Sequence, residues 1–182
     1  MEKLARPIAD GWIGPWTYRP AHFCNLRVST CDELDVQPGE MPGTTEGMVT
    51  AWFVEGYGAV HCEPNGALNL NRYLPVPAGE AHLVRRFELR EGGEVTSAFG
   101  LSDALSLELD GQEIWSGERT FQGFADRAAR GYAEPGMHSL RQALAPGSHR
   151  LAATLRVREG FGWGLALAAH GEGLRWLPAE WG

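Results

Sequence analysis

The sequence predicts an all-β protein, an antiparallel β-sandwich of jelly-roll type, and three observations support that prediction. Apolar and polar residues alternate with the two-residue period of half-buried strands in several short stretches, and no helical period of useful length is found. The 24 glycines and 11 prolines suit a chain with many turns between short strands. A length of 182 residues fits one sandwich with a well-buried core and is short for two domains. We therefore expect a single domain over residues 1–182.

The clearest element is a β-hairpin in residues 99–117, FGLSDALSLELDGQEIWSG. Leucines alternate with polar residues over 105–110, so one face of this strand should be buried and the other wet. Asp110 and Gly111 supply the two positive-φ positions of a tight primed turn. The chain should then return antiparallel and bring Trp115 back across the first strand.

Strands are also expected on both sides of this hairpin. They should lie within residues 48–54, 56–62, 68–71 and 82–90 before it, and within 151–157 and 165–169 after it. A turn at Gly92 and Gly93 should join the strand over 82–90 to one over 95–101 as a second hairpin. An edge strand is expected near residues 23–28.

The remaining stretches predict irregular structure around the sandwich. Residues 1–22 mix aromatic residues with glycine and proline, so we expect an irregular N-terminal segment draped over a sheet. Residues 32–47 and 118–139 should be long loops. The tail 174–182 contains two tryptophans and should pack back on the body.

Charge and composition disfavour several classes of function. The formal net charge of -7, without any basic run, argues against binding to nucleic acid or to an anionic membrane. No stretch reaches the roughly 18 apolar residues of a membrane span, and the N-terminus lacks the apolar core of a signal peptide. A cytoplasmic protein is expected, or a secreted one whose signal has been removed. Lys3 is the only lysine, which excludes Schiff-base and P-loop lysine chemistry. Cys24, Cys31 and Cys62 should be reduced thiols, and a single disulfide bridge between two of them is the alternative.

Three stretches follow one another in a recognisable order. They are GALNLNRY at residues 66–73, the hairpin sequence at 99–117, and LAPGSHRLAATLRVREGFGWG at 144–164. The first is similar to a G-x-V-N-L-x-R strand. The second resembles a Ser-Asp pair followed by alternating hydrophobics and an Asn-Gly turn, and the third resembles a late L-x-x-G-x-N-x-L strand with a Gly-Gly-Trp-Gly turn.

Together the three stretches resemble the galactose-binding-like jelly-roll domains, the type seen in carbohydrate-binding modules and in accessory domains of glycoside hydrolases. Asp110 and His149 stand where that family often has asparagine, and Phe161 and Gly162 replace one glycine of the late turn. The resemblance implies a jelly-roll fold and, by association, a saccharide ligand.

Sugar recognition needs aromatic faces and planar groups that make paired hydrogen bonds to neighbouring hydroxyls. Such residues gather on the return strand of the hairpin and in the loop after it. The ligand-binding residues that we predict are Trp115, Arg119, Phe121, Asp126, Arg127, Arg72 and Asp103.

Structural roles are the alternative for each of these residues. The aromatic rings could plug the end of the sandwich, and Asp103 could satisfy its own backbone. Asn69, Asn71 and Arg72 are expected on the wet face of one strand and are a second binding candidate, with a pairing of Arg72 to Glu88 or Asp103 as the alternative. Trp163 is expected to be a packing residue of a tight turn.

The function that these residues predict is a non-catalytic carbohydrate-binding or accessory module with a saccharide partner. Two alternatives stay open: a hydrolase or lyase that acts on a saccharide through two acids, and an interaction domain whose exposed tryptophans make a homo-oligomer or partner surface. The histidines and cysteines have no zinc spacing, and the cupin, zinc-protease and serine-nucleophile motifs are missing. No metal or cofactor is therefore predicted, a structural calcium ion is left open, and a non-enzyme is favoured.

Overall fold

The computed structural model describes residues 47–62, 66–74, 79–120, 122, 133, 136–158 and 163–179. The expected N-terminal segment and the edge strand near residues 23–28 lie outside these ranges. The ligand residues Phe121, Asp126 and Arg127 lie outside them too.

Ten antiparallel β-strands make up most of the described chain. They are β1 (Ala51–Val54), β2 (Gly58–His61), β3 (Ala67–Asn69), β4 (Glu80–Leu89), β5 (Gly93–Leu109), β6 (Gln112–Arg119), β7 (His138–Leu144), β8 (Gly147–Arg156), β9 (Gly164–His170) and β10 (Leu174–Trp176). A turn of 3-10 helix, η3 (Leu70–Arg72), follows β3.

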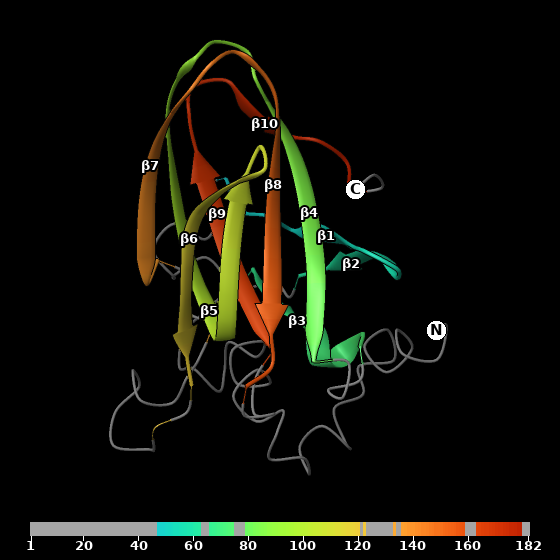
Figure 1. Cartoon of the computed structure of the whole chain (residues 1–182). Helices are drawn as coiled ribbons and strands as arrows, with labels where there is room; N and C mark the ends of the chain where they lie inside the picture. Colours follow the sequence, from blue (N-terminus) through green and yellow to red (C-terminus); the bar gives the residue numbers. More distant parts are fainter. Residues whose placement is uncertain are drawn as a thin grey trace.

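One strand, β5, belongs to both layers of the sandwich (Figure 1). Its residues 93–102 pair with β7 and β9, and its residues 103–109 pair with β6 and β8. The back layer therefore runs β3-β9-β5-β7, and the front layer runs β2-β1-β4-β8-β5-β6 with β10 beside β4. This arrangement confirms the predicted antiparallel β-sandwich of jelly-roll type.

The two ends of the sandwich differ in what they carry (Figure 1). We call the end where β6 and β8 finish the lower end, and β5 bends from the back layer to the front layer there. The opposite end, with the tight turn between β5 and β6, is the upper end.

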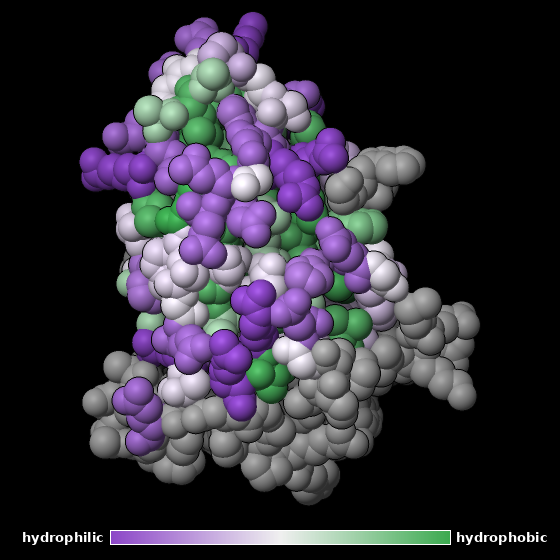
Figure 2. Space-filling view, in the orientation of Figure 1, coloured by the Kyte–Doolittle hydropathy of each residue, from purple (hydrophilic) through white to green (hydrophobic). Residues whose placement is uncertain are grey.

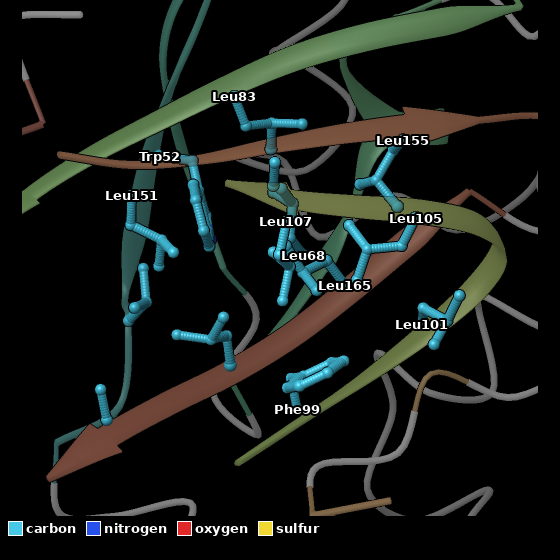
Figure 3. Close-up of a cluster of buried hydrophobic side chains, with 14 of the residues drawn as sticks. Trp52, Leu68, Leu83, Phe99, Leu101, Leu105, Leu107, Leu151, Leu155 and Leu165 are labelled. Atoms are coloured by element: carbon cyan, nitrogen blue, oxygen red, sulfur yellow. The ribbon is translucent and has the colours of Figure 1, made fainter. Parts of the chain in front are cut away.

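The core lies between the layers and is filled by the alternating leucines (Figure 3). Leu105 and Leu107 of β5 are at most 2% exposed, and Leu155 of β8 and Leu165 of β9 join them in one cluster. Fully burying one such side chain contributes about 1.5–3 kcal/mol. The alternation that predicts these strands is therefore also what stabilises the sandwich.

The outer face of the front layer is largely hydrophilic (Figure 2). Arg156 of β8 pairs with Glu80 of β4, and Arg150 of β8 lies 3.7 Å from Glu55. Exposed pairs of this kind contribute at most about 1 kcal/mol each. They keep this face solvated, and they add little to the stability of the fold.

The central hairpin is confirmed, including its turn. Asp110 (φ 51°) and Gly111 (φ 83°) take the two positive-φ positions, and Trp115 lies opposite Leu107. The register shifts after Leu107, which leaves Ile114 as the additional residue of a β-bulge.

The predicted second hairpin is wrong. β4 pairs with β8, β1 and β10, so the turn at Gly92 and Gly93 carries the chain from the front layer to the back layer. A Cβ atom on Gly92 would lie 2.9 Å from Pro146, because this crossover touches the crossover between β7 and β8 at the upper end (Figure 1). Glycines predict that a chain turns, but not whether the next strand pairs with the last one or crosses to the other layer.

Candidate functional site

Four of the six buried polar side chains of the described residues lie at the lower end of the sandwich. Asp103 (1% exposed) stands at the bend of β5 beside Ser102, and Arg119 at the end of β6 is directly opposite Asp103. Asn69 (2% exposed) ends β3, and Arg72 (7% exposed) ends η3. Strand β9 links the two groups, because its first residue pairs with both Asn69 and Ser102. We call Asn69, Arg72, Ser102, Asp103 and Arg119 the polar cluster.

Asp103 is the acidic member of the polar cluster. Its Oδ2 atom accepts a hydrogen bond of 2.8 Å from the backbone N–H of Arg158, which follows the end of β8. Directly opposite residues of antiparallel strands have Cβ atoms about 4.5–5.5 Å apart, which makes Asp103 and Arg119 neighbours. A carboxylate needs such donors in the interior, because an uncompensated buried charge costs several kcal/mol.

Trp115 lies on the same face of β6 as Arg119, two strand periods away. Its ring centroid is 5.0 Å from that of Phe99 in an edge contact and 4.8 Å from that of His138. A Cβ atom on Gly117 would lie 2.7 Å from Cη2 of Trp115, so the indole fits over a position that only glycine can occupy. The half-buried ring closes the seam between β6 and β7, the edge strands of the two layers.

The imidazole of His138 is held uncharged beside this tryptophan. Burial first, and then the positive charge of Arg119, lower the pKa of His138 below its ordinary value of 6.5. The same effect shows that Arg119 and His138 act on each other across the seam. Sequence reasoning missed His138, because no period or motif marks β7 as a strand.

The outcomes for the predicted ligand residues differ. The structure brings Asp103 and Arg119 together, places Arg72 near the same end, and places Trp115 four residues from Arg119 along β6. The wet-face expectation for Asn69 and Arg72 is wrong, because β3 stops at Asn69 and both side chains are buried. Trp163 is confirmed as a packing residue, since it is fully buried and its Nε1 atom donates to the carbonyl of Leu155.

The suggested pairing of Arg72 with Glu88 is also wrong. Glu88 lies near the upper end of β4, where its Oε2 atom is 2.6 Å from a guanidinium nitrogen of Arg175 on β10. Strand β4 carries Glu88 away from η3 along the length of the sandwich (Figure 1).

The part of the chain that the structure describes holds no group of three or more His, Cys, Asp or Glu side chains arranged for a metal ion. No helix in the same ranges has the length and apolar character that crossing a membrane requires. Cys62 is a half-buried thiol, as expected from the cysteine count.

No protein-family model and no curated protein matches the sequence. Solved structures of similar shape include a β-glucosidase from Kluyveromyces marxianus in complex with glucose, at 15% identity and a TM-score of 0.44. The match covers 64% of this chain and 14% of the β-glucosidase. A β-galacturonidase from Eisenbergiella tayi bound to galacturonate is 18% identical with a TM-score of 0.45, over 70% of this chain and 26% of that one. A family 35 carbohydrate-binding module from Cellvibrio japonicus is 14% identical with a TM-score of 0.38, over 53% of this chain and 70% of the module.

Proposed function

We propose that this protein is a non-catalytic carbohydrate-binding module whose site lies at the lower end of the sandwich. The polar cluster is the observation that carries the proposal, because buried polar groups of β3, η3 and β5 and the half-buried Arg119 of β6 all lie at that end. Such groups are destabilising in a core unless they are paired, so their gathering at one end favours a functional role. The proposed ligand residues are Trp115, Arg119, Phe121, Asp126, Arg127 and Arg72, and Asp103 supports them from behind.

Within this site the residues have different tasks. Arg119 is half-buried and carries a planar guanidinium that can donate two parallel hydrogen bonds to neighbouring sugar hydroxyls. Asp103 is 1% exposed, so it acts from behind by holding Arg119 in place and does not touch the sugar itself. Trp115 is fixed by Phe99 and His138, and its exposed part supplies apolar area at the rim.

A glycan panel tests this proposal by isothermal titration or NMR with the whole chain. Arg119→Ala should weaken binding of the preferred saccharide at least about tenfold, which corresponds to the loss of one good charged hydrogen bond. Trp115→Ala should weaken the binding of the same saccharide, because contact area between the indole and the sugar is lost. Arg141→Ala is the matched control, because Arg141 is an exposed arginine on β7 that lies 3.7 Å from Glu94.

Three results would contradict the proposal. If no saccharide of the panel bound, the proposed carbohydrate ligand would be wrong. Unchanged affinity in both Arg119→Ala and Trp115→Ala would move the site elsewhere. Release of reducing sugar from a bound glycan would favour the hydrolase or lyase alternative, since a binding module leaves its ligand intact.

A further inference from the structure

A groove lies between the β9–β10 turn and the residues just before β1. Its volume is about 690 Å³, and its lining includes Gly47, Met48, His170, Glu172, Arg175 and Trp176. Ligand pockets commonly measure about 300–1,000 Å³, so the groove is large enough for a mono- or disaccharide. It lies toward the upper end, where β9 finishes (Figure 1), and away from the polar cluster.

The indole of Trp176 is held rigidly in this groove. Its Nε1 atom donates a hydrogen bond of 2.9 Å to the carbonyl oxygen of Gly47, which also accepts the N–H of Ala169 at 3.0 Å. Phe87 makes an edge contact with the indole at 5.3 Å, and the guanidinium of Arg85 lies 5.7 Å from its ring centre. A ring that is already fixed loses little conformational entropy when a ligand packs on it.

The charges around Trp176 balance one another. The charged residues of the groove lining are Arg175 and Glu172, which carry opposite charges, and Arg175 is also paired with Glu88 at 2.6 Å. A site without net charge favours a neutral ligand over an anion or a cation. Imidazole, carboxylate and guanidinium groups also offer both donors and acceptors, which suits a molecule covered with hydroxyl groups.

We propose that this groove is a second saccharide subsite, for a neutral mono- or disaccharide that packs on Trp176 and makes hydrogen bonds to Glu172 and His170. The choice of ligand class rests on the proposed function, whereas the place of the subsite rests on the groove itself. Strand β9 runs from the polar cluster at Gly164 to the groove at His170, so at roughly 3.3 Å per residue the two sites are about 20 Å apart. A long glycan could bridge that distance, and a disaccharide could not.

The test is an NMR titration of the isotope-labelled whole chain with neutral gluco-, manno- and xylo-oligosaccharides of two units. The Nε1–H signal of Trp176 and the amide signal of Glu172 report on the groove, and the signal of Arg119 reports on the lower end. We expect the groove signals to shift and to saturate as the saccharide is added. The variants Glu172→Ala and His170→Ala should each raise the dissociation constant obtained from these signals about tenfold. Glu91→Ala is the matched control, because Glu91 is an exposed carboxylate outside the groove lining.

Each outcome decides between the two proposals. Groove signals that stay still while the Arg119 signal moves would overturn the subsite and leave the proposed function standing. Groove signals that move while the Arg119 signal stays still would support the subsite and remove the lower-end site. Binding of uronic-acid disaccharides alone would overturn the neutral subsite, and the absence of any shift would overturn both proposals. Glu172→Ala with undiminished groove binding would also overturn the subsite.

Discussion

Asp110 and His149 form a charged pair at the upper end, and the variant Asp110→Asn should lose stability in a pH-dependent way. Oδ2 of Asp110 lies 2.7 Å from Nδ1 of His149, and Nε2 of His149 lies 2.9 Å from the carbonyl oxygen of Ala145. Carboxylate and carbonyl oxygens only accept hydrogen bonds, so both ring nitrogens must carry protons and His149 is an imidazolium. Oδ1 of Asp110 accepts the N–H of Arg150 at 2.8 Å, which pins the β5–β6 turn to β8.

The two pKa shifts define the pH range of this stabilisation. Burial alone lowers the pKa of His149, but the hydrogen bonds to Asp110 and Ala145 and the charge of Asp110 outweigh it and raise the pKa above 6.5. Burial alone raises the pKa of Asp110, but the hydrogen bonds from Arg150 and His149 and the charge of His149 lower it below 3.8 overall.

The sign of each contribution follows from linkage. The raised histidine pKa gives stability that is complete below 6.5 and is lost as the pH rises through the folded-state value. The lowered carboxyl pKa gives stability that is present above 3.8 and is lost as the pH falls through the folded-state value. The pair should therefore contribute most between about pH 4 and pH 6.5.

The size of the effect can be worked from the geometry. A hydrogen bond to a charged group contributes about 1.5–3 kcal/mol. Because the side chain of Asp110 is 47% exposed, solvent screening reduces the expected loss in Asp110→Asn to about 1–2 kcal/mol. For a chain of this length that loss lowers Tm by roughly 2–8 °C.

Thermal unfolding at about pH 5.5 and about pH 8.5 measures the effect on either side of the titration of His149. The difference between wild type and Asp110→Asn should be large at the lower pH and small at the higher one. Glu113→Gln is the matched control, because Glu113 is also a carboxylate of the hairpin but accepts hydrogen bonds from the hydroxyls of Ser106 and Ser116. A deficit of equal size at both pH values would refute the assignment of His149 as an imidazolium.

Four further variants test the packing by urea denaturation. Gly47→Ala should lower the free energy of unfolding by more than about 2 kcal/mol, since the φ of Gly47 is +69° and the new Cβ atom would lie 2.1 Å from the carbonyl oxygen of Ala169. Gly111→Ala is the comparison, because Gly111 has a φ of +83° with open space around it and should lose only about 1 kcal/mol. Leu107→Ala, at a 0% exposed position, should lose about 2–5 kcal/mol, and a variant as stable as wild type would contradict its place in the core. Arg85→Met should be neutral or stabilising by about 1–4 kcal/mol, because Arg85 is 6% exposed and its Nε makes no hydrogen bond within the described residues; a clear loss would show that its charge is compensated.

Alternation made the core strands predictable from the sequence. The leucines of β5, β8 and β9 follow the two-residue period closely, so their strands and buried faces could be read directly. Asp110 and Gly111 added the position and hand of one turn, and with them the register of β6 on β5.

Strand β7 escaped prediction because its inward face is mixed. That face carries His138, Leu140, Gln142 and Leu144, all only partly buried, since β7 is an edge strand at a seam. Polar residues on an inward face remove the alternation on which sequence reading depends. The path from β4 to β5 was missed for another reason, because it depends on which layer the next strand joins.

The polar cluster was only partly predictable. Asp103 and Arg119 could each be proposed from residue type, and the hairpin register then makes them neighbours. The contact of Trp115 with His138 depends on the place of β7, which the sequence does not reveal. The burial of Arg72 depends on the end of β3 and on the start of a 3-10 turn, which residue type alone does not specify.

The continuity of β5 has a mechanical consequence. In a sandwich whose layers share no strand, the two layers can separate from each other. Here β5 runs without interruption through both layers and is hydrogen-bonded on both edges in each of them. Phe99 lies in the back layer and Leu107 in the front layer. Amide hydrogen exchange at both residues should therefore proceed through the same opening event and report the same free energy of opening. The pairing of Arg119 with Asp103 at the bend of β5 would be lost in the same event. A ligand bound there would therefore raise the free energy of opening for both layers.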